Sequence, residues 1–156
     1  TENQDAQLEG AAMKKMANIE YVKAAQVFGR LQSRFPSSAL AGKAGLRAGK
    51  AYMRAGDNRR GLAAFVLVYD NEGYNGATLR AEAMYWAGMC NENLARAIED
   101  KRGSAKALLD AFKIYKRLTY DFPESKHAAY ARGRLSNENL LELEYQQDLK
   151  KVREGR

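Results

Sequence analysis

His127 and Cys90 are the residues whose chemistry could support catalysis or metal binding, and the chain contains one residue of each type. A catalytic histidine needs a nucleophile and an orienting carboxylate, and the sequence around His127 indicates neither. Cys90 lies within an apolar stretch at 84–94, whereas reactive cysteines need a basic, open setting. One histidine and one cysteine cannot build an ordinary zinc site. We therefore expect a structural histidine, an inert thiol, no metal, no cofactor and no enzymatic activity.

The positive charge of the chain suggests a second kind of site. The formal net charge is +7 over 156 residues, which favours acidic partners such as nucleic acid or anionic lipid. Acidic and basic residues are interspersed along most of the chain, and this favours a mixed, solvated surface instead. One basic set is expected around a single turn, without the interleaved aromatic residues on which single-stranded nucleic acid stacks. Its members are Arg47, Lys50, Arg54, Arg59 and Arg60.

Aromatic and methionine side chains gather in one stretch, at Met84, Tyr85, Trp86 and Met89. Such a group can fill the core between helices. It can also form part of a binding surface, because Tyr, Trp and Met are adaptable contact residues. Both interpretations can hold at once, since Tyr85 and Trp86 point about 100° apart on a helix.

An internal repeat indicates the elements that position these residues. Ala24 and Phe28 precede Pro36 with the same spacing that Ala111 and Tyr115 show before Pro123. A weaker third copy runs from Gly61 through Phe65 to Gly73. Spacings of three and four residues place each set on one helix face, and a proline ends the helix before it. The unit is therefore predicted to be helix, short turn, helix, with all three aromatic residues buried and with Ser38 and Ser125 as caps.

The composition agrees with an all-α fold, because Ala and Leu dominate the apolar residues and only two prolines occur. We expect one domain over 1–156, with a repeat core at about 18–135 and a terminal helix that caps the last apolar face. The predicted helices cover 5–15, 19–35, 38–55, 58–72, 77–98, 104–121, 125–136 and 138–153.

Glycines recur at equivalent places in the helices that follow the turns, at Gly49, Gly88 and Gly133. Glycine inside a helix costs about 1 kcal/mol relative to alanine. Three glycines in matching positions therefore predict close helix-to-helix approach. Asp57 follows Gly56 and is expected to cap the next helix.

At this point the chain resembles a tetratricopeptide repeat. The resemblance rests on Ala48-Gly49-x2-Tyr52, then Gly56-Asp57, then Gly61-x3-Phe65. The Phe-Pro-x-Ser turns and the 84–88 stretch look like a bacterial cell-envelope subgroup, found in the Tol-Pal-associated coiled-coil protein and the outer-membrane assembly lipoprotein. The resemblance implies a short right-handed superhelix, a protein-binding scaffold and a periplasmic or envelope location, with the cytoplasm as alternative. An insertion at 98–104 makes the period uneven.

In tetratricopeptide arrays the first helix of each pair lines a concave groove. Carried onto this sequence, that register predicts a groove of basic, aromatic and Met character that suits a peptide or helix of a protein partner. A polyanion such as nucleic acid is the alternative ligand. The predicted groove residues are Lys50, Arg54, Tyr85, Met89, Tyr130 and Arg134.

No apolar run approaches the ~20 residues of a membrane span. The first ten residues are polar and acidic, unlike a signal peptide. Because the chain starts at Thr1 without methionine, we expect a fragment or a processed form.

Overall fold

The computed structural model describes residues 2–38, 40–71, 75–136, 146 and 149–155, and this part of the chain contains helices and no strands. The predicted all-α fold is therefore confirmed. Residues 149–153 are also helical. The six helices assigned with full bounds are α1 (Glu2–Arg34), α2 (Ala41–Arg54), α3 (Asn58–Asp70), α4 (Ala77–Ala97), α5 (Lys101–Asp121) and α6 (Lys126–Leu135).

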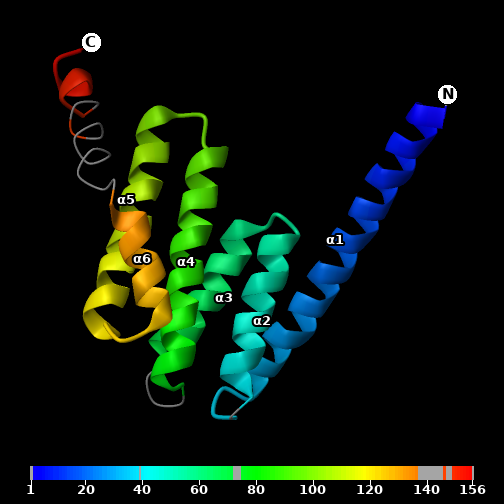
Figure 1. The fold of residues 1–156 in the computed structure, drawn as a ribbon, viewed down its shortest axis with the longest axis horizontal. Coiled ribbons are helices and arrows are strands. Elements are labelled where there is room, and N and C mark those ends of the chain that lie inside the picture. The colour runs from blue at the N-terminus through cyan, green and yellow to red at the C-terminus, as the bar shows by residue number, and fades with distance from the viewer. Residues whose placement is uncertain (1, 39, 72–74, 137–145, 147–148, 156) are drawn as a thin grey trace.

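The helices form antiparallel pairs, and Figure 1 shows α2 with α3 beside α4 with α5. Helix α1 packs on α2 before the first pair, and α6 packs on α5 after the second. Helix α4 also contacts both α2 and α6. The first helices of successive units therefore lie next to one another, as in tetratricopeptide arrays. The right-handed twist and the single-domain organisation stay predictions.

Helix starts follow local side-chain chemistry. The carboxylate of Asp57 accepts a hydrogen bond from the Arg60 amide at 3.1 Å and caps α3, and Asp100 caps α5 through the Gly103 amide. The Ser125 hydroxyl accepts from the His127 amide and caps α6, as predicted. Ser38 is different: its hydroxyl accepts from the Leu40 amide, inside the turn that precedes α2.

Three predicted boundaries are wrong, among them the start of α2, which begins at Ala41 rather than at 38. The segments at 5–15 and 19–35 form a single helix, α1, of 33 residues, because residues 11–18 contain neither proline nor glycine. Figure 1 shows the N-terminal half of α1 standing away from the other helices. Helix α5 begins at Lys101 rather than at 104, so residues 101–104 of the predicted insertion belong to this helix. Most of the predicted terminal helix, namely 138–145 and 147–148, lies outside the described residues.

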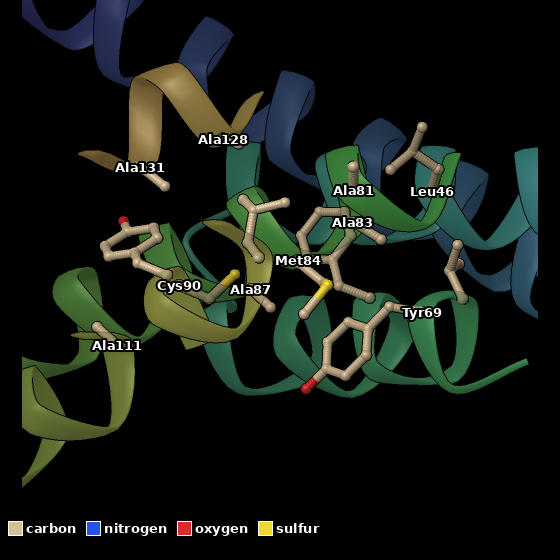
Figure 2. Close-up of a cluster of buried hydrophobic side chains, with 14 of the residues drawn as sticks. Leu46, Tyr69, Ala81, Ala83, Met84, Ala87, Cys90, Ala111, Ala128 and Ala131 are labelled. Carbon is tan, nitrogen blue, oxygen red and sulfur yellow. The ribbon is translucent and has the colours of Figure 1, made fainter. Parts of the chain in front are cut away.

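The core gathers between α3, α4, α5 and α6, with Phe65, Met84 and Tyr115 fully buried. Figure 2 shows Met84 and Cys90 in a cluster that also includes alanines of α4, α5 and α6. Small residues let neighbouring helices approach closely, so the aromatic rings fill the remaining volume.

The glycine prediction is confirmed at two of three positions. A Cβ atom at Gly49 would overlap the Phe65 ring, and one at Gly88 would overlap the Tyr115 ring. At Gly133 the prediction stays untested, because most of the helix predicted to follow α6 lies outside the described residues. The burial prediction is also wrong for Phe28, which is only partly buried against a small cluster of alanines.

Candidate functional site

The predicted groove residues come from α2, α4 and α6, and the first contact between them joins α2 to α4. Lys50 Nζ lies 2.6 Å from Glu82 Oε2 and 5.5 Å from the centre of the Trp86 ring. Trp86 Nε1 donates a hydrogen bond to the same carboxylate oxygen at 3.1 Å. Glu82 therefore holds a cation and an indole together at the surface between the two helices.

Tyr85 joins α4 to α6 through its aromatic ring. Its centroid lies 5.3 Å from that of Trp86 in an edge arrangement, 5.7 Å from Tyr130 and 5.7 Å from His127. The His127 and Tyr130 rings are in turn 5.6 Å apart and nearly perpendicular. Such spacings are favourable for aromatic pairs. We call Tyr85, Trp86, His127 and Tyr130 the aromatic strip.

A buried carboxylate anchors the other end of the strip. Arg134 donates to Glu92 through Nε at 3.0 Å and Nη2 at 2.9 Å, a bidentate arrangement. Tyr115 Oη donates to Glu92 Oε2 at 2.6 Å. Only 8% of Glu92 is exposed. The contacts link the α4–α5 core to the surface of α6.

Two predicted residues are not brought into these contacts. The guanidinium of Arg54 lies 5.8 Å from the centre of the Tyr21 ring and therefore faces α1. Met89 is partly buried one turn after Tyr85 on α4. The structure thus groups Lys50, Tyr85, Tyr130 and Arg134, while Arg54 and Met89 lie at the margins.

A cleft of about 520 Å³ adjoins the aromatic strip at His127. It lies between the start of α4 and the turn from α5 to α6. Its walls include Thr78, Phe122, Pro123 and Lys126. An apolar side chain of a partner could enter such a cleft.

A comparison with protein families decides the family of this chain. The family described as YfiO, outer membrane lipoprotein, matches this chain over residues 1–146. The chain belongs to the YfiO family. Searches of the curated proteins and of the solved structures gave no match. The resemblance to the cell-envelope repeat subgroup is therefore confirmed.

Membership of the YfiO family gives this chain an envelope-associated location rather than the cytoplasmic alternative. It also supports a scaffold-type role in protein interactions of outer-membrane assembly. No helix within the described ranges is long and apolar enough to cross a membrane.

The local environment shifts several pKa values in this YfiO-family chain. Burial alone would raise the pKa of Glu82, but hydrogen bonds from Lys50 and Trp86 outweigh it, so the pKa is lowered. Burial lowers the pKa of His127, and Lys126 and Lys50 act in the same direction against Glu82. Burial, together with the Glu92 carboxylate, raises the pKa of Tyr115. At neutral pH the ionised carboxylate of Glu82 therefore lies beside the strip, and the imidazole of His127 within the strip is uncharged.

The two residues with catalytic potential are both buried. Burial raises the pKa of the Cys90 thiol to about 12, so the thiol stays protonated at neutral pH. The imidazole of His127 is packed between tyrosine rings. In the described part of the chain, no group of three or more potential metal ligands occurs.

The predicted groove residues did not include Glu82, Glu92 or His127. Glu92 lies four residues after Gly88 and three before Ala95, on a face that is otherwise buried. A carboxylate in such a register indicates a buried cationic or hydroxyl partner. That signal could have identified the Glu92 network, although not its partners.

Proposed function

We propose that this chain is a non-enzymatic scaffold that binds a segment of a protein partner across the aromatic strip on α2, α4 and α6. The contact of Tyr85 with Trp86, Tyr130 and His127 carries this proposal. Aromatic residues are enriched among the residues that dominate interface energies. Tyr130 remains 52% exposed, so it can contact a partner while its ring stays in the cluster.

The strip is held in place before a partner arrives. Lys50, Glu82 and Trp86 fix one end, and Glu92 with Arg134 fixes the other. A surface with ordered side chains loses less conformational entropy on binding. This arrangement favours a preformed groove over a surface that must fold around its partner.

Charge pairing bears on the polyanion alternative. Lys50 is paired with Glu82 at 2.6 Å, and Arg134 with Glu92 at 2.9 Å. Two of the predicted cations of the groove are thus already neutralised. We infer that recognition depends mainly on aromatic and apolar contacts, because these two cations already have carboxylate partners and are less available to a phosphate.

Site-specific photo-crosslinking in the intact bacterial envelope tests the proposal. A photoreactive phenylalanine analogue replaces Tyr130 in one variant and Tyr120 in a matched control. Tyr120 is an 87% exposed tyrosine of α5 that takes no part in the strip. We expect a discrete protein adduct from position 130 and a much weaker one from position 120. Equal adducts at both positions, or none at 130, would contradict the groove assignment.

Salt dependence then separates the two kinds of ligand. A phosphate-dominated complex weakens linearly in log salt, with a slope set by the number of neutralised phosphates. For the captured partner we expect a shallow dependence, and a Trp86→Ala variant that stays folded should bind more weakly at every salt concentration. A steep slope combined with normal binding by Trp86→Ala would favour the polyanion alternative.

A further inference from the structure

The cleft beside the aromatic strip contains a buried imidazole with unused hydrogen-bonding capacity. Only 7% of His127 is exposed, and this residue lines the cleft between the start of α4 and the α5–α6 turn. Its backbone amide donates to the Ser125 hydroxyl. In the part of the chain that the structure describes, its ring nitrogens form no hydrogen bond, and the ring contacts are those with Tyr85 and Tyr130. Because a buried polar group is costly without a partner, this ring is suited to a polar group that enters the cleft.

Two helix starts meet at the same cleft. Its walls include Ala77 and Thr78 at the start of α4, and Ser125 and Lys126 at the start of α6. The first amides of a helix have no partner inside the helix, so a helix start attracts negative charge. Ser125 caps α6, whereas Gly76 before α4 provides no side-chain cap. The first turn of α4, the buried imidazole and the Lys126 ammonium therefore favour an anionic group between them.

The other lining residues restrict which anion the cleft accepts. Phe122 and Pro123 give it an apolar wall, and Asp121 and Glu124 add two carboxylates. Asp121 already pairs with Arg117 at 3.3 Å. The negative charges oppose a doubly charged phosphate more strongly than a singly charged carboxylate. The apolar wall suits the carbon stem of a side chain. The cleft therefore favours an acidic side chain over a phosphate.

We propose that this cleft receives an Asp or Glu side chain of the partner segment that binds the aromatic strip, and that His127 donates a hydrogen bond to its carboxylate. The inference rests on the proposed function, because the same imidazole belongs to the strip. It adds a chemical requirement to that function, namely an acidic residue at the end of the segment that lies over α6. A neutral imidazole has one N–H donor and an imidazolium has two, so either form can donate to a carboxylate.

Protonation of His127 and binding of the carboxylate should strengthen each other. Glu82 on α4 favours the imidazolium, whereas Lys50 on α2 and Lys126 on α6 oppose it. The two carboxylates at the α5–α6 turn line the cleft as well. A bound carboxylate adds a further negative charge close to the ring and so raises the pKa of His127. By linkage, the carboxylate binds more tightly to the protein with a protonated ring.

Nuclear magnetic resonance of the histidine ring tests this coupling, because His127 is the one histidine of the chain. The probe is N-acetyl-glutamate methylamide, which carries the side chain of an internal glutamate. The matched control is the glutamine analogue, which has the same shape without the charge, and a third titration uses inorganic phosphate. We expect the glutamate probe to bind about tenfold more tightly to the imidazolium than to the neutral ring, and so to raise the pKa of His127. The glutamine analogue should leave this pKa unchanged, and phosphate should raise it less than the glutamate probe.

Thr78 allows a charge test with the natural partner. Thr78→Glu places a carboxylate in the cleft, and Thr78→Gln adds a side chain of similar size without charge. The residue is exposed in the first turn of α4, so both variants should fold. Each is combined with the photoreactive analogue at position 130 in the intact envelope. We expect Thr78→Glu to lower the yield of the adduct about threefold or more relative to Thr78→Gln, because like charges repel.

The outcomes separate the cleft from the strip. A pKa of His127 that responds equally to the glutamate and glutamine probes, or more strongly to phosphate, would overturn the carboxylate assignment. Equal adducts from Thr78→Glu and Thr78→Gln would show that the partner places no acidic side chain in the cleft. Both results leave the parent's adduct at position 130 intact as the test of the proposed function. Loss of that adduct refutes the proposed function, and the resonance titration still decides whether the cleft binds a carboxylate.

Discussion

Replacing the three matched glycines by alanine tests how the helix pairs are held together. At Gly88 the new methyl group meets the Tyr115 ring, which is fully buried and whose hydroxyl donates to Glu92 at 2.6 Å. The ring cannot tilt away without breaking that hydrogen bond. Overpacking of this kind costs about 1–3 kcal/mol, and the better helix propensity of alanine offsets about 1 kcal/mol of it.

The other two glycines give a graded series. Gly49→Ala meets the Phe65 ring, which has no polar group to hold it and can shift more easily. Its cost should be smaller than that of Gly88→Ala. Gly133→Ala meets open space in the described chain, so the helix term acts alone and stability should rise by up to about 1 kcal/mol.

Equilibrium unfolding in urea, followed by circular dichroism at a concentration where the chain is monomeric, measures the series. The expected order of unfolding free energy is Gly133→Ala, parent, Gly49→Ala, then Gly88→Ala, with the m-value unchanged. Adding Tyr115→Phe to Gly88→Ala frees the ring, so the double variant should lose less than the sum of the single losses. A Gly88→Ala variant as stable as the parent would refute the close-approach argument.

Three further perturbations follow from the same contacts. Phe65→Ala should lower the unfolding free energy by about 3–5 kcal/mol and Phe28→Ala by clearly less, because only Phe65 is fully buried. Denaturant midpoints that are the same for the two variants would contradict this. Glu92→Gln should cost about 1–3 kcal/mol, since it removes a charged acceptor from Arg134; no loss in urea unfolding would show that the pair is dispensable. Because the pKa of His127 in the folded state lies below its ordinary value of 6.5, the unfolded state binds the proton more readily, and the free energy of unfolding falls as the pH drops below 6.5. His127→Gln should therefore flatten the dependence of stability on pH between about pH 7 and about pH 5, and an unchanged dependence would show that this histidine does not cause it.

The repeat made the helix pairs predictable because its signals are local. Proline, glycine and capping residues determine where a helix ends, and they act within a few positions. Asp57 and Ser125 were identified as caps for this reason. The break predicted within α1 failed on the same principle, because the sequence between 15 and 19 contains neither proline nor glycine.

The contacts of the candidate site were not predictable in the same way. Glu92 and Arg134 are 42 residues apart, and their meeting depends on how α6 is rotated against α4. A repeat register says which helix faces the groove but leaves the pairing of side chains open. It placed Arg54 in the groove, whereas the α1–α2 packing directs that residue toward Tyr21.

Glu92 connects the packing of the core to the candidate binding surface. Its carboxylate accepts from Tyr115, whose ring packs on Gly88, and from Arg134, which lies beside the strip. A buried ion pair is often no more stable than apolar residues of the same volume, so stability alone gives little reason for a carboxylate at this position. What it adds is direction, because a bidentate pair fixes the orientation of a side chain in a way that apolar contact does not. The rotation of α6 against α4 determines where Tyr130 meets Tyr85. The Glu92–Arg134 pair thus sets the geometry of the strip from inside the core, and a partner that binds Tyr130 meets a ring whose position the core has already determined.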